Sequence, residues 1–180
     1  QTFCLFVAIR YFQAGPDIKA VIAASPWMGM LISLILVHYA AKTGFRKSIC
    51  GAIPAAFAAC CLSMAALTDG LYTFTILVFF AYMSETALFP FLTSIYHDNY
   101  PSDKRGQLLG NSMRLTVACS IVFSYIASWF LDVDLTHWTS IFAALGLAGF
   151  FKAYAIFSMP STAIEPGYPN PFTSLKYLLE

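Results

Sequence analysis

Ionisable side chains are rare inside the long apolar segments of this sequence, and Glu85 is the deepest of them. It precedes His97 by twelve positions, about 18 Å along a helix, which is too far for a short acidic side chain to reach the segment end. A charge at the centre of a bilayer costs at least roughly 2.5 kcal/mol on insertion scales, so such residues commonly mark functional sites. Glu85 is therefore either a carboxylate that exchanges protons or binds substrate, or a structural partner for a cation on a neighbouring helix.

Four further side chains are candidates for the same site. Arg114, in the first half of another apolar segment, is the predicted partner of Glu85, and it serves either to bind a substrate anion or to pair structurally. Tyr82 and Phe89 share the face of Glu85 by helical spacing, so they either line the same pocket or simply pack. Arg10 either faces an outer cavity or extends to the interface from its helix end.

The remaining polar and aromatic residues indicate no second chemistry. Lys152 is predicted to extend its ammonium group to the nearer interface, and Trp27 and Trp138 are predicted interface anchors. The five cysteines fall in apolar runs, as is typical of packing residues. Three histidines near segment ends, His38, His97 and His137, are too scattered for one metal. We therefore expect no metal, no cofactor and no enzyme activity, and no Gly-rich phosphate loop is present.

Composition identifies the class of protein that must position these residues. The sequence is 59% hydrophobic and 11% charged, whereas an ordinary soluble domain has about 25% charged residues. The lipid bilayer is the expected environment. A net charge of +1 gives no indication of a nucleic-acid partner, and we expect none.

Six apolar segments follow one another along the chain, at about 3–12, 18–41, 48–68, 71–95, 107–131 and 138–159. About twenty residues cross roughly 30 Å of hydrocarbon as a helix. We therefore predict an all-α polytopic membrane protein with six transmembrane helices, the first of them truncated. Pro26 predicts a kink in the second helix and Gly29 a close helix approach, and the Ala- and Ser-rich third helix is predicted to serve packing.

The distribution of loop charge predicts an orientation. The connections 42–47 and 98–106 carry Lys and Arg, whereas the connection 132–134 is acidic. Short loops rich in Lys and Arg stay on the cytoplasmic side during insertion. We predict that loops 42–47 and 98–106 and the carboxy-terminal segment face the cytoplasm, in a cytoplasmic (inner) or plasma membrane.

The turn Lys42-Thr43-Gly44-Phe45-Arg46-Lys47 resembles the signature of the major facilitator superfamily between its second and third helices, Gly-x-x-x-Asp-Arg-x-Gly-Arg-Arg/Lys. Aligned on Gly44, the first cation falls on Lys42 and the later pair on Arg46 and Lys47, shifted by one position. Two departures are Ala41 at the acidic position and Val37 at that of the first Gly. The connection 100–106, with Tyr-Pro and Lys-Arg-Gly, is a second and weaker similarity.

The resemblance implies half of a twelve-helix carrier, in which each six-helix half contains two inverted three-helix repeats and substrate binds between the halves. Residues 1–160 would form the amino-terminal half-bundle, and residues 161–180 a cytoplasmic linker to the carboxy-terminal six-helix half of the same protein. In the family the loop forms an inner latch, which makes Lys42, Gly44, Arg46 and Lys47 candidates for a gating loop.

Two classes of function are compatible with these patterns. The first is a secondary active transporter that moves a small-molecule substrate by alternating access, with proton coupling through Glu85 as an option. The second is a non-transport six-helix membrane protein, either an intramembrane enzyme or an assembly subunit. Transport is favoured because the sequence has no zinc run, paired Asp set or Ser-His dyad at membrane depth.

Overall fold

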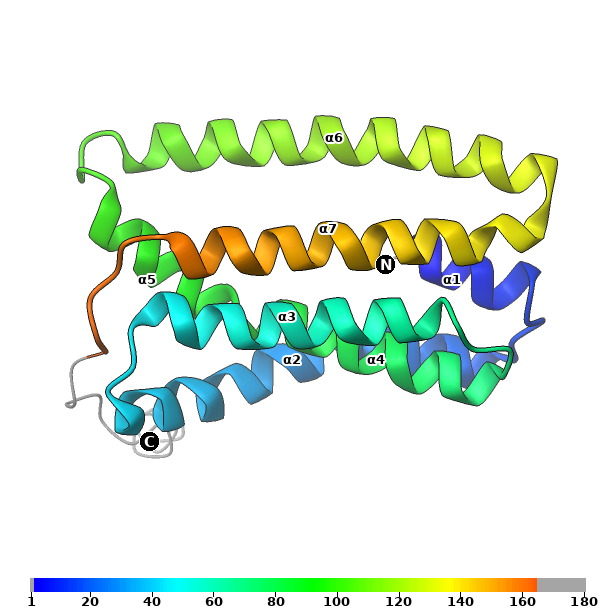
Figure 1. Cartoon of the computed structure of the whole chain (residues 1–180), viewed down its shortest axis with the longest axis horizontal. Coiled ribbons are helices and arrows are strands. Elements are labelled where there is room, and N and C mark those ends of the chain that lie inside the picture. Colours follow the sequence, from blue (N-terminus) through cyan, green and yellow to red (C-terminus); the bar gives the residue numbers. More distant parts are fainter. Residues whose placement is uncertain (1, 165–180) are drawn as a thin grey trace, which may run out of the picture.

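The computed structural model describes residues 2–164, and within this range the regular elements are all helical (Figure 1). In order, they are α1 (Thr2–Arg10), α2 (Pro16–Thr43), α3 (Lys47–Ala65), α4 (Leu71–Ala87), α5 (Phe89–Asn99), α6 (Arg105–Val133), the 3-10 turn η1 (Leu135–His137) and α7 (Trp138–Ser158). Five described segments are long and apolar enough to cross a membrane, with α4 and α5 counted together. The helices are those of an integral membrane protein, and α1, with nine residues, is too short to span.

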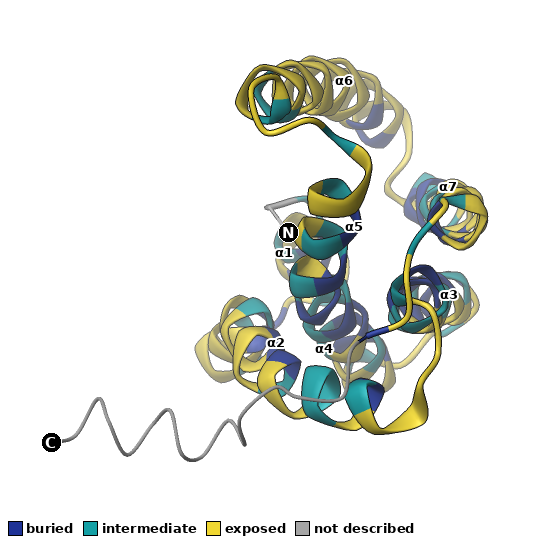
Figure 2. Cartoon of the chain, turned by 90° about the vertical axis from the view of Figure 1, so that its left-hand side faces the viewer, coloured by how far each residue is buried: buried dark blue, intermediate teal, exposed yellow. Residues whose placement is uncertain are grey.

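The helices run roughly parallel or antiparallel in one bundle, with α3 packed against both α7 and α4, and α2 packed against α4 (Figures 1 and 2). The most apolar stretch of α3 is the most buried of the five spans, which confirms its predicted packing role. In contrast, α6 lies at one side of the bundle and is exposed along nearly its whole length (Figure 2). Its buried residues are Ala127 and Leu131, close to its carboxy-terminal end.

Glycine allows the closest helix contacts. A Cβ atom at Gly29 on α2 would collide with the Thr86 hydroxyl and the Met83 carbonyl of α4. This contact confirms the close approach predicted for Gly29. On α7, a Cβ at Gly149 would lie 2.8 Å from the Cβ of Ala59 on α3. Small residues thus set the spacing of the two main helix pairs.

Proline shapes two of the helices. In α2, Pro26 lacks the amide that would bond the Ile22 carbonyl, and the Ser25 hydroxyl donates to that carbonyl instead, at 2.7 Å. The predicted single helix 71–95 is interrupted at Leu88, and Pro90 lies in the first turn of α5. The hydroxyl of Thr86, just before this break, donates to the Pro26 carbonyl at 3.0 Å. The two proline sites therefore meet in space.

An aromatic cluster fills the core toward the end where α6 joins α7. Trp138 is 1% exposed, and its ring lies 5.6 Å from those of Phe74 and Phe142. Phe12 packs on Phe74 at 4.9 Å. The prediction that Trp138 anchors at an interface is therefore wrong, because neighbouring helices enclose the ring. Trp27, in contrast, is 71% exposed.

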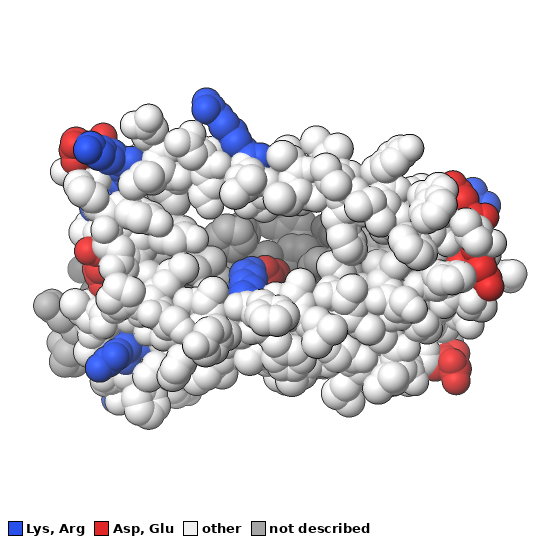
Figure 3. Space-filling model, turned by 45° about the horizontal axis from the view of Figure 1, so that its top comes forward, with Lys and Arg blue, Asp and Glu red and all other residues white. Residues whose placement is uncertain are grey.

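Most charged side chains lie at the two ends of the bundle, and each end carries both signs (Figure 3). The cationic connections 42–47 and 98–106 lie together at one end, on the left of Figure 1. The other end carries four aspartates, Asp17, Asp69, Asp132 and Asp134, together with Arg10 and Lys19. We call these the cationic end and the acidic end. The fold thus brings loops of like charge to the same side, as the sequence predicted.

Candidate functional site

Glu85 on α4 forms an ion pair with Lys152 on α7, through its Oε1 and the lysine Nζ. The two side chains are 41% and 40% exposed, so the pair lies at a surface between helices and not in a closed core. The predicted pairing with Arg114 is wrong, and so is the prediction that Lys152 extends to the interface. Both errors have one cause: α7, which packs on α3, brings Lys152 within reach of Glu85, whereas α6 lies at the side of the bundle (Figure 2).

Glu85 lies at the midpoint of the combined α4–α5 span, and Lys152 lies about two thirds of the way along α7. Glu85 follows the start of α4 at Leu71 by fourteen positions, and Lys152 follows the start of α7 at Trp138 by the same number. Both helices begin at the acidic end and rise by 1.5 Å per residue, so both charges lie about 21 Å from it. Because Glu85 and Lys152 lie at the same distance from the acidic end, their side chains can meet without either one extending along the bundle. In Figure 3 a basic and an acidic side chain meet at a hollow in the middle of the molecule.

Arg114 has no ion-pair partner among residues 2–164 and is exposed on α6. Arg114 precedes Thr116 by two positions, which is about 200° around a helix. It therefore faces away from the cavity that Thr116 lines, which is described next. Arg10 is the last residue of α1 and is exposed, with its guanidinium 5.8 Å from the ring centre of Phe6. Neither arginine meets Glu85 in the described structure.

A cavity of about 710 Å³ lies between α1, α4, α6 and α7; we call it the hollow. Its lining combines aromatic rings with hydroxyl and thiol groups: Phe3, Tyr82, Leu115, Thr116, Cys119, Ser120, Phe123, Ser124 and Leu145. Tyr82 is one helical turn from Glu85, and Leu145 is two turns from Lys152. Neither Glu85 nor Lys152 lines the hollow, but both lie within one to two helical turns of residues that do.

The hydroxyls of α6 form a stripe that faces this hollow. Thr116 donates to the Ser112 carbonyl at 2.9 Å, and Ser120 donates to the Thr116 carbonyl at 2.8 Å. Their protons are thus used within the helix, while their oxygen lone pairs stay available as acceptors. Across the hollow, the Tyr82 hydroxyl lies 3.1 Å from the sulfur of Cys4. The spacing of four residues in 112, 116, 120 and 124 could have revealed this stripe in the sequence.

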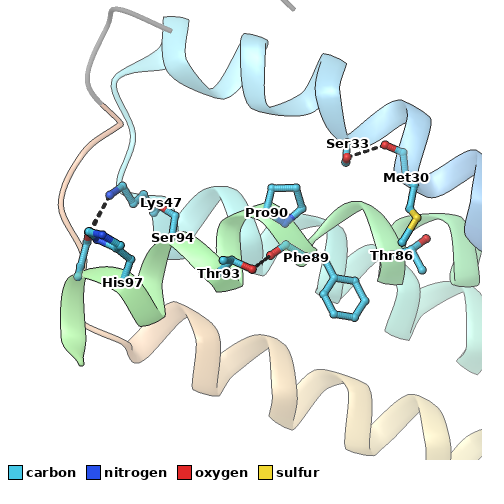
Figure 4. Close-up of a pocket in the computed structure, with 10 residues that line it drawn as sticks. Met30, Ser33, Lys47, Thr86, Phe89, Pro90, Thr93, Ser94 and His97 are labelled. Atoms are coloured by element: carbon cyan, nitrogen blue, oxygen red, sulfur yellow. Dashed lines mark hydrogen bonds and ion pairs between the residues drawn. The ribbon is translucent and has the colours of Figure 1, made fainter. Parts of the chain in front are cut away.

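Phe89 does not share a cavity with Tyr82. It lines a second cavity of about 810 Å³ between α2 and α5, whose other lining residues include Met30, Ser33 and Thr93 (Figure 4). The predicted common face required one continuous helix, and the break at Leu88 ends that continuity. The two aromatic candidates therefore lie at different sites.

The basic turn takes part in a polar cluster at the cationic end. Lys47 bonds both carboxylate oxygens of Asp98, at 2.8 and 3.0 Å. Thr162 donates to Asp98 at 2.9 Å, and its carbonyl accepts from the Lys47 amide at 3.1 Å. Ser161 accepts from the Ser48 amide at 3.0 Å. We call this group, which joins α3, α5 and the segment 160–164, the Lys47–Asp98 cluster.

The other residues of the turn have simpler environments. Gly44 has φ +67°, a left-handed conformation that ends α2 and that glycine adopts without strain. Lys42 places its ammonium group 5.7 Å from the ring centre of Tyr39. Arg46 precedes α3 and pairs through its backbone with Ala163. The sequence did not predict the Lys47–Asp98 cluster, because nothing local connects Lys47 with Asp98 or with the segment after α7.

At the acidic end, Asp134 caps η1 by accepting from the Thr136 amide at 2.8 Å. This hydrogen bond holds the pKa of Asp134 below its usual range, so the carboxylate stays charged. Within residues 2–164, no group of three or more His, Cys, Asp or Glu side chains is arranged to hold a metal ion.

The hollow with its ion pair is thus the site where membrane-depth charge, polar groups and open volume coincide. No family model, curated protein or solved structure matches this chain, so the kinship indicated by the basic turn stays a resemblance.

Proposed function

We propose that this chain is the amino-terminal half of a secondary active transporter of the major-facilitator type, which moves a small solute by alternating access. The observation that carries the proposal is the Glu85–Lys152 pair, which lies away from both ends of the spans and beside the hollow. Charges at this depth are costly, and they typically mark ion or substrate pathways.

The position of α6 supports the same proposal. Two cavities separate it from the bundle, the hollow and a smaller one of about 210 Å³ between α6 and α7. A helix that few side chains hold in place can move at low cost, because few contacts must break. Under the proposal, α6 is the wall that shifts as the solute enters or leaves, and α2, α3, α4 and α7 form the rigid frame.

The break between α4 and α5 at Leu88 lies about one turn from Glu85. Helix breaks at proline are where spanning helices bend. In the proposed cycle, bending at Leu88 changes the tilt of α5 and so opens or closes the cavity on the α2 side. The cationic end faces the cytoplasm, and the missing half of the site comes from a carboxy-terminal six-helix half of the same protein.

Vesicle assays test this function directly. The full-length protein, reconstituted with a pH-sensitive dye inside the vesicles, is exposed to a panel of neutral, zwitterionic, anionic and cationic solutes. Transport predicts protein-dependent exchange of at least one labelled solute, and proton coupling predicts dye changes driven by that solute. Folded, inserted protein that exchanges no solute above protein-free vesicles would favour the alternative class, a non-transport membrane protein.

A further inference from the structure

The hollow has two charges of opposite sign beside it, and its walls combine apolar side chains with uncharged hydroxyl and thiol groups. Glu85 and Lys152 neutralise each other, and Arg114 faces away on the outer side of α6. Within residues 2–164, the other acidic and basic side chains belong to the two ends of the bundle or to the acidic-end turn. The region around the hollow therefore has no net charge to offer a solute.

This arrangement discriminates between solutes by their charge. A singly charged cation that binds Glu85 competes with Lys152 for the carboxylate, and the lysine charge is then only partly compensated. A singly charged anion that binds Lys152 competes with Glu85 in the same way. An uncharged solute leaves the pair intact, and a zwitterion replaces each partner with a group of the right sign.

We propose that the hollow selects amphipathic solutes of zero net charge, uncharged or zwitterionic, and that the Glu85–Lys152 pair is the element that rejects ions of either sign. This inference rests on the proposed transport function and names its substrate class. The aromatic rings of Phe3 and Phe123 receive the apolar part of the solute. The acceptor oxygens of Thr116 and Ser120 suit a solute that carries O–H or N–H donors.

Cys119 provides a reporter inside the hollow, because it lines the cavity on α6 and is exposed. It precedes the end of α6 at Val133 by fourteen positions, so it lies at the depth of the ion pair. The full-length protein would carry Ala at the native positions Cys50, Cys60 and Cys61, while buried Cys4 is kept. The measured quantity is the rate at which Cys119 reacts with neutral, zwitterionic, cationic and anionic methanethiosulfonates.

The matched control is Ile121→Cys in a protein with Cys119→Ala. Position 121 lies on the same helix at nearly the same depth and is 66% exposed, but it is turned by about 200° from Cys119. Dividing each rate at Cys119 by the rate of the same reagent at position 121 removes the intrinsic reactivity of the reagent and the effect of depth.

With the native pair, the neutral and zwitterionic reagents should have rate ratios about tenfold higher than either charged reagent, since stranding a partly exposed charge costs less than stranding a fully buried one. Glu85→Gln should raise the ratio of the anionic reagent alone, and Lys152→Gln that of the cationic reagent alone. The exchanged pair, Glu85→Lys with Lys152→Glu, preserves neutrality and should restore the native pattern, which keeps the inference testable where a single variant does not fold.

A cationic or anionic reagent that reacts with Cys119 as fast as the neutral one in the native pair would overturn the inference. Single variants that raise the rate ratios of the cationic and the anionic reagent equally would overturn it as well. The proposed function fails differently. Charge selection at Cys119 in a protein that exchanges no solute would support the selective hollow and contradict the transport function. Efficient exchange of a singly charged solute would support the transport function and refute the selectivity.

Discussion

Breaking the Glu85–Lys152 pair should destabilise the protein by a moderate amount that depends on both partners. Removing one member of a fully buried pair costs about 3–5 kcal/mol, whereas an exposed pair is worth about 0–1 kcal/mol. The two side chains here are 41% and 40% exposed. We therefore expect Glu85→Gln and Lys152→Gln each to lower the free energy of unfolding by about 2 kcal/mol.

The double variant separates pairing from the loss of either group. With both charges removed, no ion is stranded, so the combined loss should fall short of the sum of the two single losses by at least about 1 kcal/mol. Unfolding in mixed micelles of mild detergent and sodium dodecyl sulfate, followed by tryptophan fluorescence, measures all three variants. Arg114→Gln is the matched control, because Arg114 is exposed and unpaired among the described residues, and it should change stability by less than about 0.5 kcal/mol.

Additive effects of Glu85→Gln and Lys152→Gln would refute the pairing. A coupling free energy between Glu85→Gln and Arg114→Gln as large as that expected between Glu85→Gln and Lys152→Gln would also refute the pairing. Such a coupling would show that α6 packs against α4. If Glu85 also couples transport to protons, Glu85→Gln should abolish uphill solute accumulation while exchange persists. Normal uphill accumulation by that variant would assign the residue to structure.

Three further tests address the helix contacts and the two ends. Gly29→Ala should lower the free energy of unfolding by about 2 kcal/mol, because a methyl group has no room against α4, whereas Gly110→Ala, in open space, should be neutral or stabilising by up to about 1 kcal/mol; equal losses would contradict the close approach. Asp98→Asn should raise the rate of amide hydrogen exchange in the segment 161–164 several-fold, because it weakens the Lys47–Asp98 cluster. An unchanged exchange rate would show that the cluster does not stabilise this segment. A single Cys at Phe45 should resist an impermeant thiol reagent added outside intact cells, and a single Cys at Asp69 should react; the reverse pattern would invert the orientation.

The spans themselves could be predicted from the sequence, because length and hydropathy are properties of one segment at a time. The three charged connections were predicted in the right places but too long, because the helices extend into each of them and leave only residues 44–46, 100–104 and 134 between helices. Charges and turn residues are excluded from apolar spans wherever the neighbours lie. The close approach at Gly29 was also predictable, because few reasons other than packing place glycine in the middle of a spanning helix.

The partners of these side chains depended on the tertiary structure. Helical periodicity gives the depth of Glu85 and the face it occupies on its own helix, but it does not say which helix packs against that face. The fold places α7 there and leaves α6 at the side, so Lys152 forms the ion pair and Arg114 faces outward. The break at Leu88 likewise separates Phe89 from Tyr82, and neighbouring helices enclose Trp138. The sequence alone therefore determined the membrane-spanning helices and the depth of each charge, while packing decided which charges meet, because contacts between helices depend on how whole helices are rotated and arranged around one another.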